Sequence, residues 1–197
     1  EITNEKFPIS LKAYGDGPLQ LSTDKNFQMY PLLEGFGEHI SNKHQLSAIF
    51  ENPAFSCFSE INVLPLIYDE KKQRCNILVF DAERARNQTA YIKKATEGAG
   101  RKHPAYRFFD KNDCYICEVR YGNATANALQ RGLWTNTKNA TPFFDSVTNG
   151  WVDYSHNLVL VKLFSHALVS SSKGHEVALD EIKKDITNLK QANGINA

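Results

Sequence analysis

No apolar run in this sequence reaches the roughly 18 residues that a membrane-spanning helix needs. We therefore expect that this chain is not a membrane protein. Internal repeats, coiled-coil heptads and low-complexity segments are lacking as well. With 197 residues, of which 42% are apolar and 23% charged, the chain has the composition of a globular protein with its own core. Its length allows one large domain or two small ones.

The chain also lacks an excess of charge of one sign. Its formal net charge of +1 is far from the basic balance of a dedicated nucleic-acid-binding protein. Between Glu83 and Lys111, however, basic residues outnumber acidic ones. This segment can attract phosphate groups or can simply form a solvated surface. The candidate phosphate ligands are Arg84, Arg86, Lys93, Lys94, Arg101 and Lys102.

Motifs of common catalytic centres are absent too. No Gly-x-Ser-x-Gly nucleophile motif occurs, and the six histidines show no metal-ligand spacing. Gly98 and Gly100 lie in a basic loop without the Lys-Ser/Thr pair of a phosphate-binding loop. We therefore expect neither a metal nor a cofactor.

Cysteine is sparse, and its even count has three interpretations. Cys57, Cys75, Cys114 and Cys117 would form two disulfides of undefined pairing in a secreted chain. Free thiols are one alternative, and a metal or redox site is another. The segment after Cys117 is strand-like, whereas a redox Cys-x-x-Cys pair belongs at a helix N-terminus. No second close pair completes a zinc site, so disulfides are favoured.

Three sequons, at Asn87, Asn123 and Asn139, are possible acceptors for N-linked glycans. Together with the cysteines they favour a secreted protein.

The densest apolar segments lie between Glu60 and Lys94. Three runs, at 61–68, 77–80 and 90–92, are rich in β-branched and aromatic residues and are separated by polar clusters. This pattern predicts consecutive strands of one antiparallel sheet.

Further elements are predicted on both sides of this segment. Strands are predicted near 7–11, 19–21, 106–109, 115–119 and 158–163. Helices are predicted at 41–50, at 123–133 and, from the clearest helical spacing of apolar residues, at 177–189. The chain is therefore predicted to have an α+β fold with a C-terminal helix.

Several short motifs follow one another between residues 27 and 118. They are Tyr30-Pro31, Glu34-Gly35-Phe36, Glu60 to Ile67, Cys75 to Asp81 and Ala90 to Ala95. In order and pattern they resemble the small guanyl-specific fungal ribonucleases. The resemblance implies a twisted antiparallel sheet with a helix packed on it.

The resemblance also implies roles for particular positions. In that family a strand glutamate is the general base, a histidine is the general acid and an arginine stabilises phosphate charge. Glu60 matches the base, but the arginine position falls near Asn76 and the histidine position on Lys93 or Lys94. Lysine is a poorer proton donor than histidine at neutral pH. Glu60 is therefore interpreted as the remnant of a lost active site.

Loss of catalytic residues on a retained sheet is similar to the ribonuclease-like secreted effectors of plant-pathogenic fungi, notably powdery mildews. Those proteins carry Tyr-x-Cys shortly before a helix, as Tyr115-Ile-Cys117 does here. In the effectors this element opens the domain, whereas here it follows the predicted sheet. We predict a single domain over 1–197 with a ribonuclease-like core at about 27–118. The C-terminal part, about 119–197, is an extension of that domain or a divergent second unit.

The leading hypothesis is a secreted, non-catalytic virulence effector that is delivered into host cells and binds host protein or RNA. The resemblance implies that a plant immune receptor recognises such a protein. One alternative is an active secreted ribonuclease that uses Glu60 with a displaced histidine such as His103. Another is an unrelated secreted glycoprotein that binds its partner through the face from Arg84 to Lys111. The sequence does not define the oligomeric state.

Overall fold

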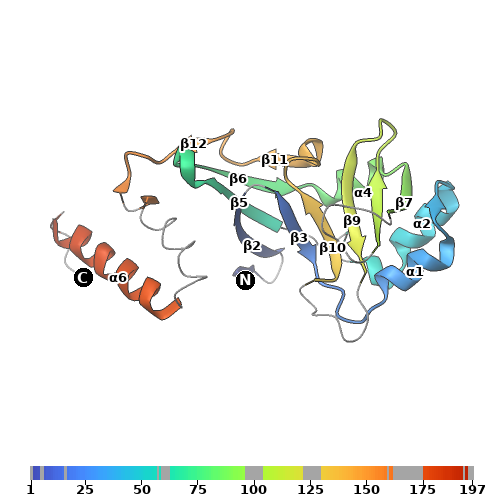
Figure 1. Cartoon of the computed structure of the whole chain (residues 1–197), viewed down its shortest axis with the longest axis horizontal. Helices are drawn as coiled ribbons and strands as arrows, with labels where there is room; N and C mark the ends of the chain where they lie inside the picture. The colour runs from blue at the N-terminus through green and yellow to red at the C-terminus, as the bar shows by residue number, and fades with distance from the viewer. Residues whose placement is uncertain are drawn as a thin grey trace.

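The chain folds into two β-sheets and several helices, as Figure 1 shows. This computed structural model describes residues 2–4, 7–15, 17–56, 58, 63–95, 104–121, 130–158, 160–161, 175–192 and 194. The predicted α+β class is confirmed, although the strands belong to two sheets rather than one.

The first sheet is mixed, because one of its strand pairs is parallel. Its strands, in order, are β1 (Ile2–Asn4), β2 (Phe7–Gly15), β5 (Val63–Asp69), β6 (Arg74–Phe80) and β11 (Phe144–Ser146), and the short β12 (Val152–Asp153) also pairs with β6. β2 and β5 run parallel, and the other pairs are antiparallel. A 3-10 turn, η2 (Glu70–Lys72), joins β5 to β6.

The second sheet is antiparallel throughout. Its strands, in order, are β3 (Pro18–Ser22), β10 (Gly132–Asn136), β9 (Tyr115–Arg120), β8 (Ala105–Phe109), β7 (Tyr91–Ala95) and β4 (His39–Ile40). β3 and β10 lie outside the predicted ribonuclease-like core at 27–118, yet they complete this sheet.

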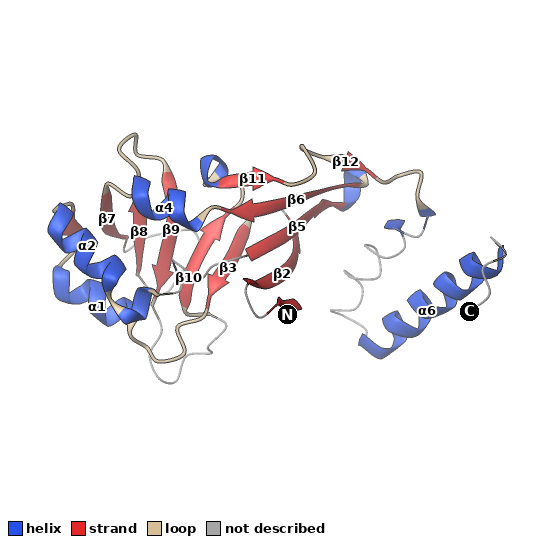
Figure 2. Cartoon of the chain, turned by 180° about the vertical axis from the view of Figure 1, so that it is seen from behind, coloured by secondary structure: helices blue, strands red, loops and turns tan. Residues whose placement is uncertain are grey.

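Two helices pack on one face of the second sheet. α1 (Met29–Phe36) contacts β8, β9 and α2 (Lys43–Glu51), and η1 (Pro53–Phe55) follows α2. Figure 2 shows α1 and α2 side by side next to these strands. The carboxylate of Asp24 accepts hydrogen bonds from the backbone N–H groups of Gln28 and Met29, and Asn42 caps α2 in the same way. Both helix starts are therefore defined by side chains that precede them.

The core lies between these helices and the second sheet. Four phenyl rings from α2, from η1 and the residues after it, and from β8 pack with ring centroids 5.2 to 6.5 Å apart. They are Phe50, Phe55, Phe58 and Phe108. Phe80, at the end of β6, belongs to the same cluster and connects the first sheet to this core.

The prediction that residues 60–94 form one sheet is wrong. β5 and β6 pair as expected, but β7 lies in the second sheet. The cause is the helix α4 (Ala82–Gln88), which follows β6 directly. The side chain of Asp81 accepts a hydrogen bond from the N–H of Arg84 and so caps a helix within a polar segment for which the sequence pattern predicts only a link between strands. That helix carries the chain from one sheet to the other.

Most other predicted elements are confirmed. The strands predicted near 7–11, 19–21, 106–109 and 115–119 are β2, β3, β8 and β9, and the helices predicted at 41–50 and 177–189 are α2 and α6 (His175–Ala192). Among the described residues, no helix is long and apolar enough to cross a membrane.

Two predicted elements are wrong where the structure describes them. Gly132 and Leu133, at the end of the predicted helix 123–133, begin strand β10. Leu158, Leu160 and Val161 form a helical turn instead of a strand, with the N–H of Val161 donating to the carbonyl of Asn157. Residues 122–129 lie outside the described residues.

We predict that β10 depends on glycine at position 132. Gly132 has a φ of +107°, and a Cβ there would collide with the backbone oxygen of Ser22 and lie 2.6 Å from the backbone nitrogen of Asp24. The atoms in the way belong to the backbone of β3 and of the residues after it, so they cannot move away from the added Cβ as a flexible side chain could. We therefore expect Gly132→Ala to lower the free energy of unfolding by about 2–4 kcal/mol. Urea denaturation followed by circular dichroism measures the change.

Gly35→Ala is the matched control for this substitution. Gly35 is exposed in α1 with no atom within 4 Å of the added Cβ. Alanine in a helix is more stable than glycine by roughly 0.5–1 kcal/mol. A Gly132→Ala protein as stable as Gly35→Ala would rule out the close approach of the two strands.

Candidate functional site

The second sheet has two unlike faces, because side chains alternate along each strand. On β8, Tyr106 and Phe108 are fully buried beneath the helices, whereas Arg107 and Phe109 lie half-buried on the opposite side. We call this opposite side the open face. The strand registers place on it His39, Tyr91, Lys93, Arg107, Phe109, Tyr115, Glu118, Arg120 and Trp134.

Polar side chains form a row across the open face. His39 of β4 lies opposite Lys93 of β7, and Lys93 lies opposite Arg107 of β8. Arg107 in turn lies opposite Glu118 of β9, and Glu118 lies opposite Trp134 of β10. Directly opposite residues have Cβ atoms about 4.5–5.5 Å apart, so the members of the row are close neighbours, and Arg107 and Glu118 form an ion pair.

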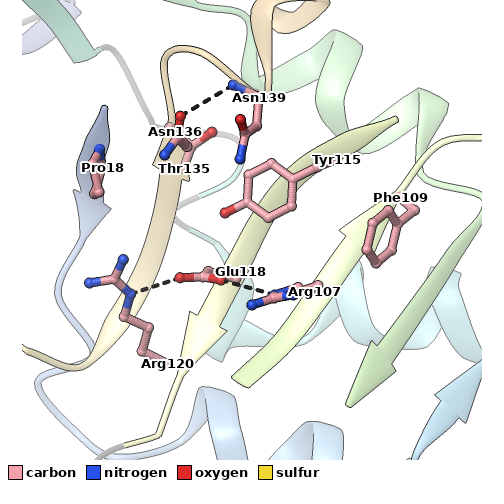
Figure 3. A pocket seen from close by; sticks show the side chains of 9 residues that line it. All are labelled: Pro18, Arg107, Phe109, Tyr115, Glu118, Arg120, Thr135, Asn136 and Asn139. Atoms are coloured by element: carbon pink, nitrogen blue, oxygen red, sulfur yellow. Dashed lines mark hydrogen bonds and ion pairs between the residues drawn. The ribbon is translucent and has the colours of Figure 1, made fainter. Parts of the chain in front are cut away.

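Glu118 is the buried member of this row. The residue is only 2% exposed, and its two carboxylate oxygens are paired with two guanidinium groups, as Figure 3 shows. Nε of Arg120 donates to Oε1 at 2.8 Å, and Nε of Arg107 lies 3.5 Å from Oε2. A carboxylate is rarely this deeply buried unless it is paired. The two arginines therefore explain how a glutamate is accommodated in the middle of the sheet.

The two arginines remain accessible while they hold Glu118. Their side chains are 32% and 21% exposed for Arg107 and Arg120, respectively. The guanidinium carbon of Arg120 lies 3.7 Å from the centroid of the Trp134 ring, an arrangement that orients the group by cation–π attraction. With exposed Lys93 beside them, the row carries more positive than negative charge.

Aromatic rings lie beside this basic row. The rings of Tyr91 and Phe109 stack at a centroid distance of 5.0 Å, and Tyr115 meets Phe109 edge to face at 6.3 Å. The hydroxyl of Tyr91 donates to Asp113 at 2.8 Å. Burial and this hydrogen bond raise the pKa of Tyr91, so its phenol is neutral at physiological pH. The open face thus combines cationic groups with uncharged ring surfaces.

A pocket of about 240 Å³ opens on this face. Figure 3 shows the side chains that line it, which are Pro18, Arg107, Phe109, Tyr115, Glu118, Arg120, Thr135, Asn136 and Asn139. Its size suits a phosphate group or a single planar ring better than a drug-sized ligand.

The predicted phosphate ligands do not share one surface. Arg84 on α4 is bound by acidic partners, since its Nη2 lies 2.9 Å from Asp145 and 3.0 Å from Asp81. The guanidinium of Arg86 lies 5.8 Å from the ring centroid of Phe50. Neither is placed to bind a ligand on the open face.

The two neighbouring lysines of β7 point to opposite sides of the sheet. Lys93 lies exposed on the open face, whereas Lys94 pairs with Glu34 of α1 at 3.1 Å. The hydrogen bond that Lys94 donates to the Glu34 carboxylate raises the pKa of Lys94, so this lysine stays charged as a structural ion pair. Arg101 and Lys102 lie outside the described residues.

The positions matched to a ribonuclease active site are not brought together where the structure describes them. Asn76 is buried in β6 of the first sheet, where its Oδ1 accepts hydrogen bonds from Ser146 and Thr148 at 2.6 and 2.9 Å. Lys93 and Lys94 are in the second sheet. Glu60, the matched base, and His103 lie outside the described residues.

The two predicted disulfides are not formed. Cys75 on β6 and Cys114, just before β9, are free thiols, so four cysteines cannot form two pairs. Burial raises the pKa of both thiols and keeps them protonated at neutral pH. Cys117 is buried in the core, and Cys57 lies outside the described residues. No group of three His, Cys, Asp or Glu in the described part of the chain is arranged to hold a metal.

The three sequons also fall in different places. Asn87 is exposed on α4, Asn139 is exposed at the rim of the pocket, and Asn123 lies outside the described residues. Their glycosylation stays a prediction.

Glu118, Arg120, Tyr115 and Trp134 are the site residues that sequence reasoning missed. A signal for some of them was present: Arg107 and Phe109 on one strand, and Glu118 and Arg120 on the next, alternate with residues that a core requires. Alternation identifies the shared face of each strand, but only the pairing of β8 with β9 brings Arg107 to Glu118.

No family model, curated protein or solved structure matches this chain. The side chains of the open face must therefore indicate what it binds.

We predict that Glu118 stabilises the sheet through its two arginines. Glu118→Gln removes the countercharge of two partly buried guanidinium groups, so we expect the free energy of unfolding to fall by about 2–4 kcal/mol. Glu38→Gln is the control, because Glu38 is exposed in a loop and should change stability by less than about 0.5 kcal/mol. Thermal and urea denaturation of both variants measure the difference. Equal effects of the two substitutions would show that the buried pairing is unimportant.

Proposed function

We propose that the open face binds single-stranded RNA and that the chain does not cleave it. The observation that carries this proposal is the combination, on one sheet face, of the basic row with three contacting rings, the stacked pair Tyr91 and Phe109 and the edge-to-face Tyr115. Single-stranded nucleic acids are bound where cationic side chains contact phosphates and aromatic rings stack on the bases.

The cations of the face suit phosphate recognition. Arg107 and Arg120 both line the pocket, and the planar guanidinium group can donate two parallel hydrogen bonds to a phosphate. Lys93 extends the positive charge toward β7 and β4. Glu118 offsets part of this charge, so we expect moderate, salt-dependent affinity rather than the tight binding of a strongly basic protein.

The acid–base groups of this face support binding rather than catalysis. A general base must have an oxygen within hydrogen-bond reach of the ribose proton, and both oxygens of Glu118 are already paired with arginines. His39 is the histidine of the row, but Lys93 and Arg107 stand between it and Glu118. Three strand spacings place these two residues roughly 14 Å apart, too far to act on one phosphodiester.

The biological setting that we propose is the one implied by the sequence resemblance. It is a secreted, ribonuclease-like virulence effector that acts on host RNA inside plant cells and that an immune receptor can recognise. The general architecture of the second sheet, antiparallel strands with α1 and α2 packed on one face, is of the kind that the resemblance implies, although the motif strands β5 and β6 lie in the first sheet. A host protein as the ligand of this face is the competing outcome of the experiments below.

We predict that Lys93 contributes charge to RNA binding. Lys93→Gln should weaken binding of a short fluorescein-labelled single-stranded RNA, because one phosphate contact is lost. The slope of log affinity against log salt should also fall in magnitude by about 0.7. Fluorescence anisotropy over a series of salt concentrations measures both quantities. Lys72→Gln is the control, because Lys72 is exposed in η2 beside the first sheet and should leave affinity and slope unchanged.

We predict that Tyr115 contributes a stacking surface. Tyr115→Leu keeps an apolar side chain but removes the ring, and one base–aromatic stack is worth about 1–3 kcal/mol, so affinity should fall roughly tenfold. Tyr68→Leu, in the first sheet, is the matched control and should bind like the wild type. Stability of each variant is checked by circular dichroism.

Two results would contradict the proposal. The first is the absence of salt-dependent RNA binding by the folded chain, which would leave a host protein as the ligand. The second is cleavage of guanine-rich RNA that Glu118→Gln or Glu60→Gln abolishes and Glu38→Gln does not. That result would establish an active ribonuclease.

A further inference from the structure

The polar groups that the pocket offers to a ligand are mainly hydrogen-bond donors. Arg107 and Arg120 contribute guanidinium N–H groups, and Asn136 contributes its amide nitrogen. The amide oxygen of Asn136 is engaged, because it accepts from the backbone N–H groups of Lys138 and Asn139 at 3.0 and 3.2 Å. Both oxygens of Glu118 are paired with the arginines. A complementary ligand is rich in acceptors, and a phosphate is such a ligand.

The pocket also lies at one end of the aromatic surface. The rings of Tyr91, Phe109 and Tyr115 run from β7 across β8 to β9. The side of the pocket beyond Tyr115 is formed by Asn139 and by Pro18, as Figure 3 shows. Pro18 belongs to the edge strand β3. A strand whose bases stack along these rings would place its end, rather than an internal linkage, in the pocket.

We infer that the pocket binds the terminal phosphate of an RNA strand, and this inference rests on the proposed function. A terminal phosphate monoester carries a charge of about −1.5 to −2 at pH 7 and three acceptor oxygens, whereas an internal diester carries one charge. Arg107 of β8 and Arg120 of β9 flank Glu118 and can donate to the monoester from two sides. The 5′ and 3′ phosphates share this chemistry.

The test compares one short RNA sequence in three forms: with a 5′ phosphate, with a 3′ phosphate and with hydroxyl groups at both ends. The full chain is titrated into each labelled RNA, and anisotropy gives the affinities. We expect one phosphorylated form to bind at least tenfold more tightly than the hydroxyl form, and the better form identifies the end that is recognised. Inorganic phosphate should compete with that form and not with the hydroxyl form at the same concentration.

Variants separate terminal recognition from general attraction. Arg107→Lys and Arg120→Lys keep the charge but lose the planar guanidinium group, so each should weaken binding of the phosphorylated form more than that of the hydroxyl form and thereby reduce the tenfold preference. Lys93→Gln should weaken all forms equally and leave the preference unchanged. The preference is a ratio of two affinities of one protein, so partial unfolding of a variant does not change it. Two arginine variants are made so that one remains if the other fails to fold.

The pH dependence gives an independent readout. The second pKa of a phosphate monoester is near 6, so its dianion is lost as the pH falls from about 7.5 to 5.5. The preference for the phosphorylated form should shrink over that range, and it is compared as a ratio of affinities at each pH because the charged groups of the open face act on both forms.

The outcomes distinguish this inference from the proposed function. Equal affinity for all three RNA forms would overturn the terminal-phosphate inference and leave RNA binding intact. Absence of binding to every form would overturn the proposed function and the inference together. A preference that both arginine variants retain would place phosphate recognition outside this pocket and would also overturn the inference.

Discussion

Packing of α1 and α2 against one face of the second sheet is the constraint on which the rest of the described structure depends. Ile92, Phe108 and Cys117 are buried toward the helices. Because side chains alternate along a strand, the next residue of each strand must lie on the open face. A register shift of one residue would bury the charged row and expose the core. Burial of the apolar set therefore determines that Lys93, Arg107 and Glu118 share a surface.

Within that surface, stability alone does not account for Glu118. Removing a carboxylate and its partners from water costs several kcal/mol, and their mutual attraction often does no more than offset this cost. Apolar residues at the same positions would serve a purely structural sheet at least as well. What Glu118 supplies is orientation: Arg107 and Arg120 are held at fixed positions with the stacked Trp134 beside them. Cations that are held in place before a ligand arrives lose less conformational entropy when they bind it.

The sequence was sufficient to predict elements whose signals are local. The recurring apolar residues of α6 and the alternation in β8 and β9 are visible within a few positions, and the corresponding predictions are confirmed. α4 was missed because its cap, Asp81, lies in a polar segment that also has the composition of a loop. The division into two sheets follows from that one short helix.

The site could be predicted only in fragments. Lys93 is among the predicted ligands and lies on the open face, whereas Arg84, which has the same charge, is bound by Asp145, a partner 61 residues away. Pairings of this kind, like that of Arg107 with Glu118, depend on which strands become neighbours. Glu60, the residue that carried the ribonuclease interpretation, lies outside the described residues.

The pairing of β3 with β10 has a consequence for the synthesis of the chain. Gly17 and Thr137 are joined by hydrogen bonds across 120 residues, and β3, whose Leu19 and Leu21 are buried in the core, pairs with β10. At about 5–20 residues per second, the ribosome makes β10 on the order of ten seconds after β3. During that interval the nascent chain contains β3 without the strand with which it pairs. β3 is thus synthesised first among the strands of the second sheet but is among the last to be paired. It is the part that a chaperone would have to protect.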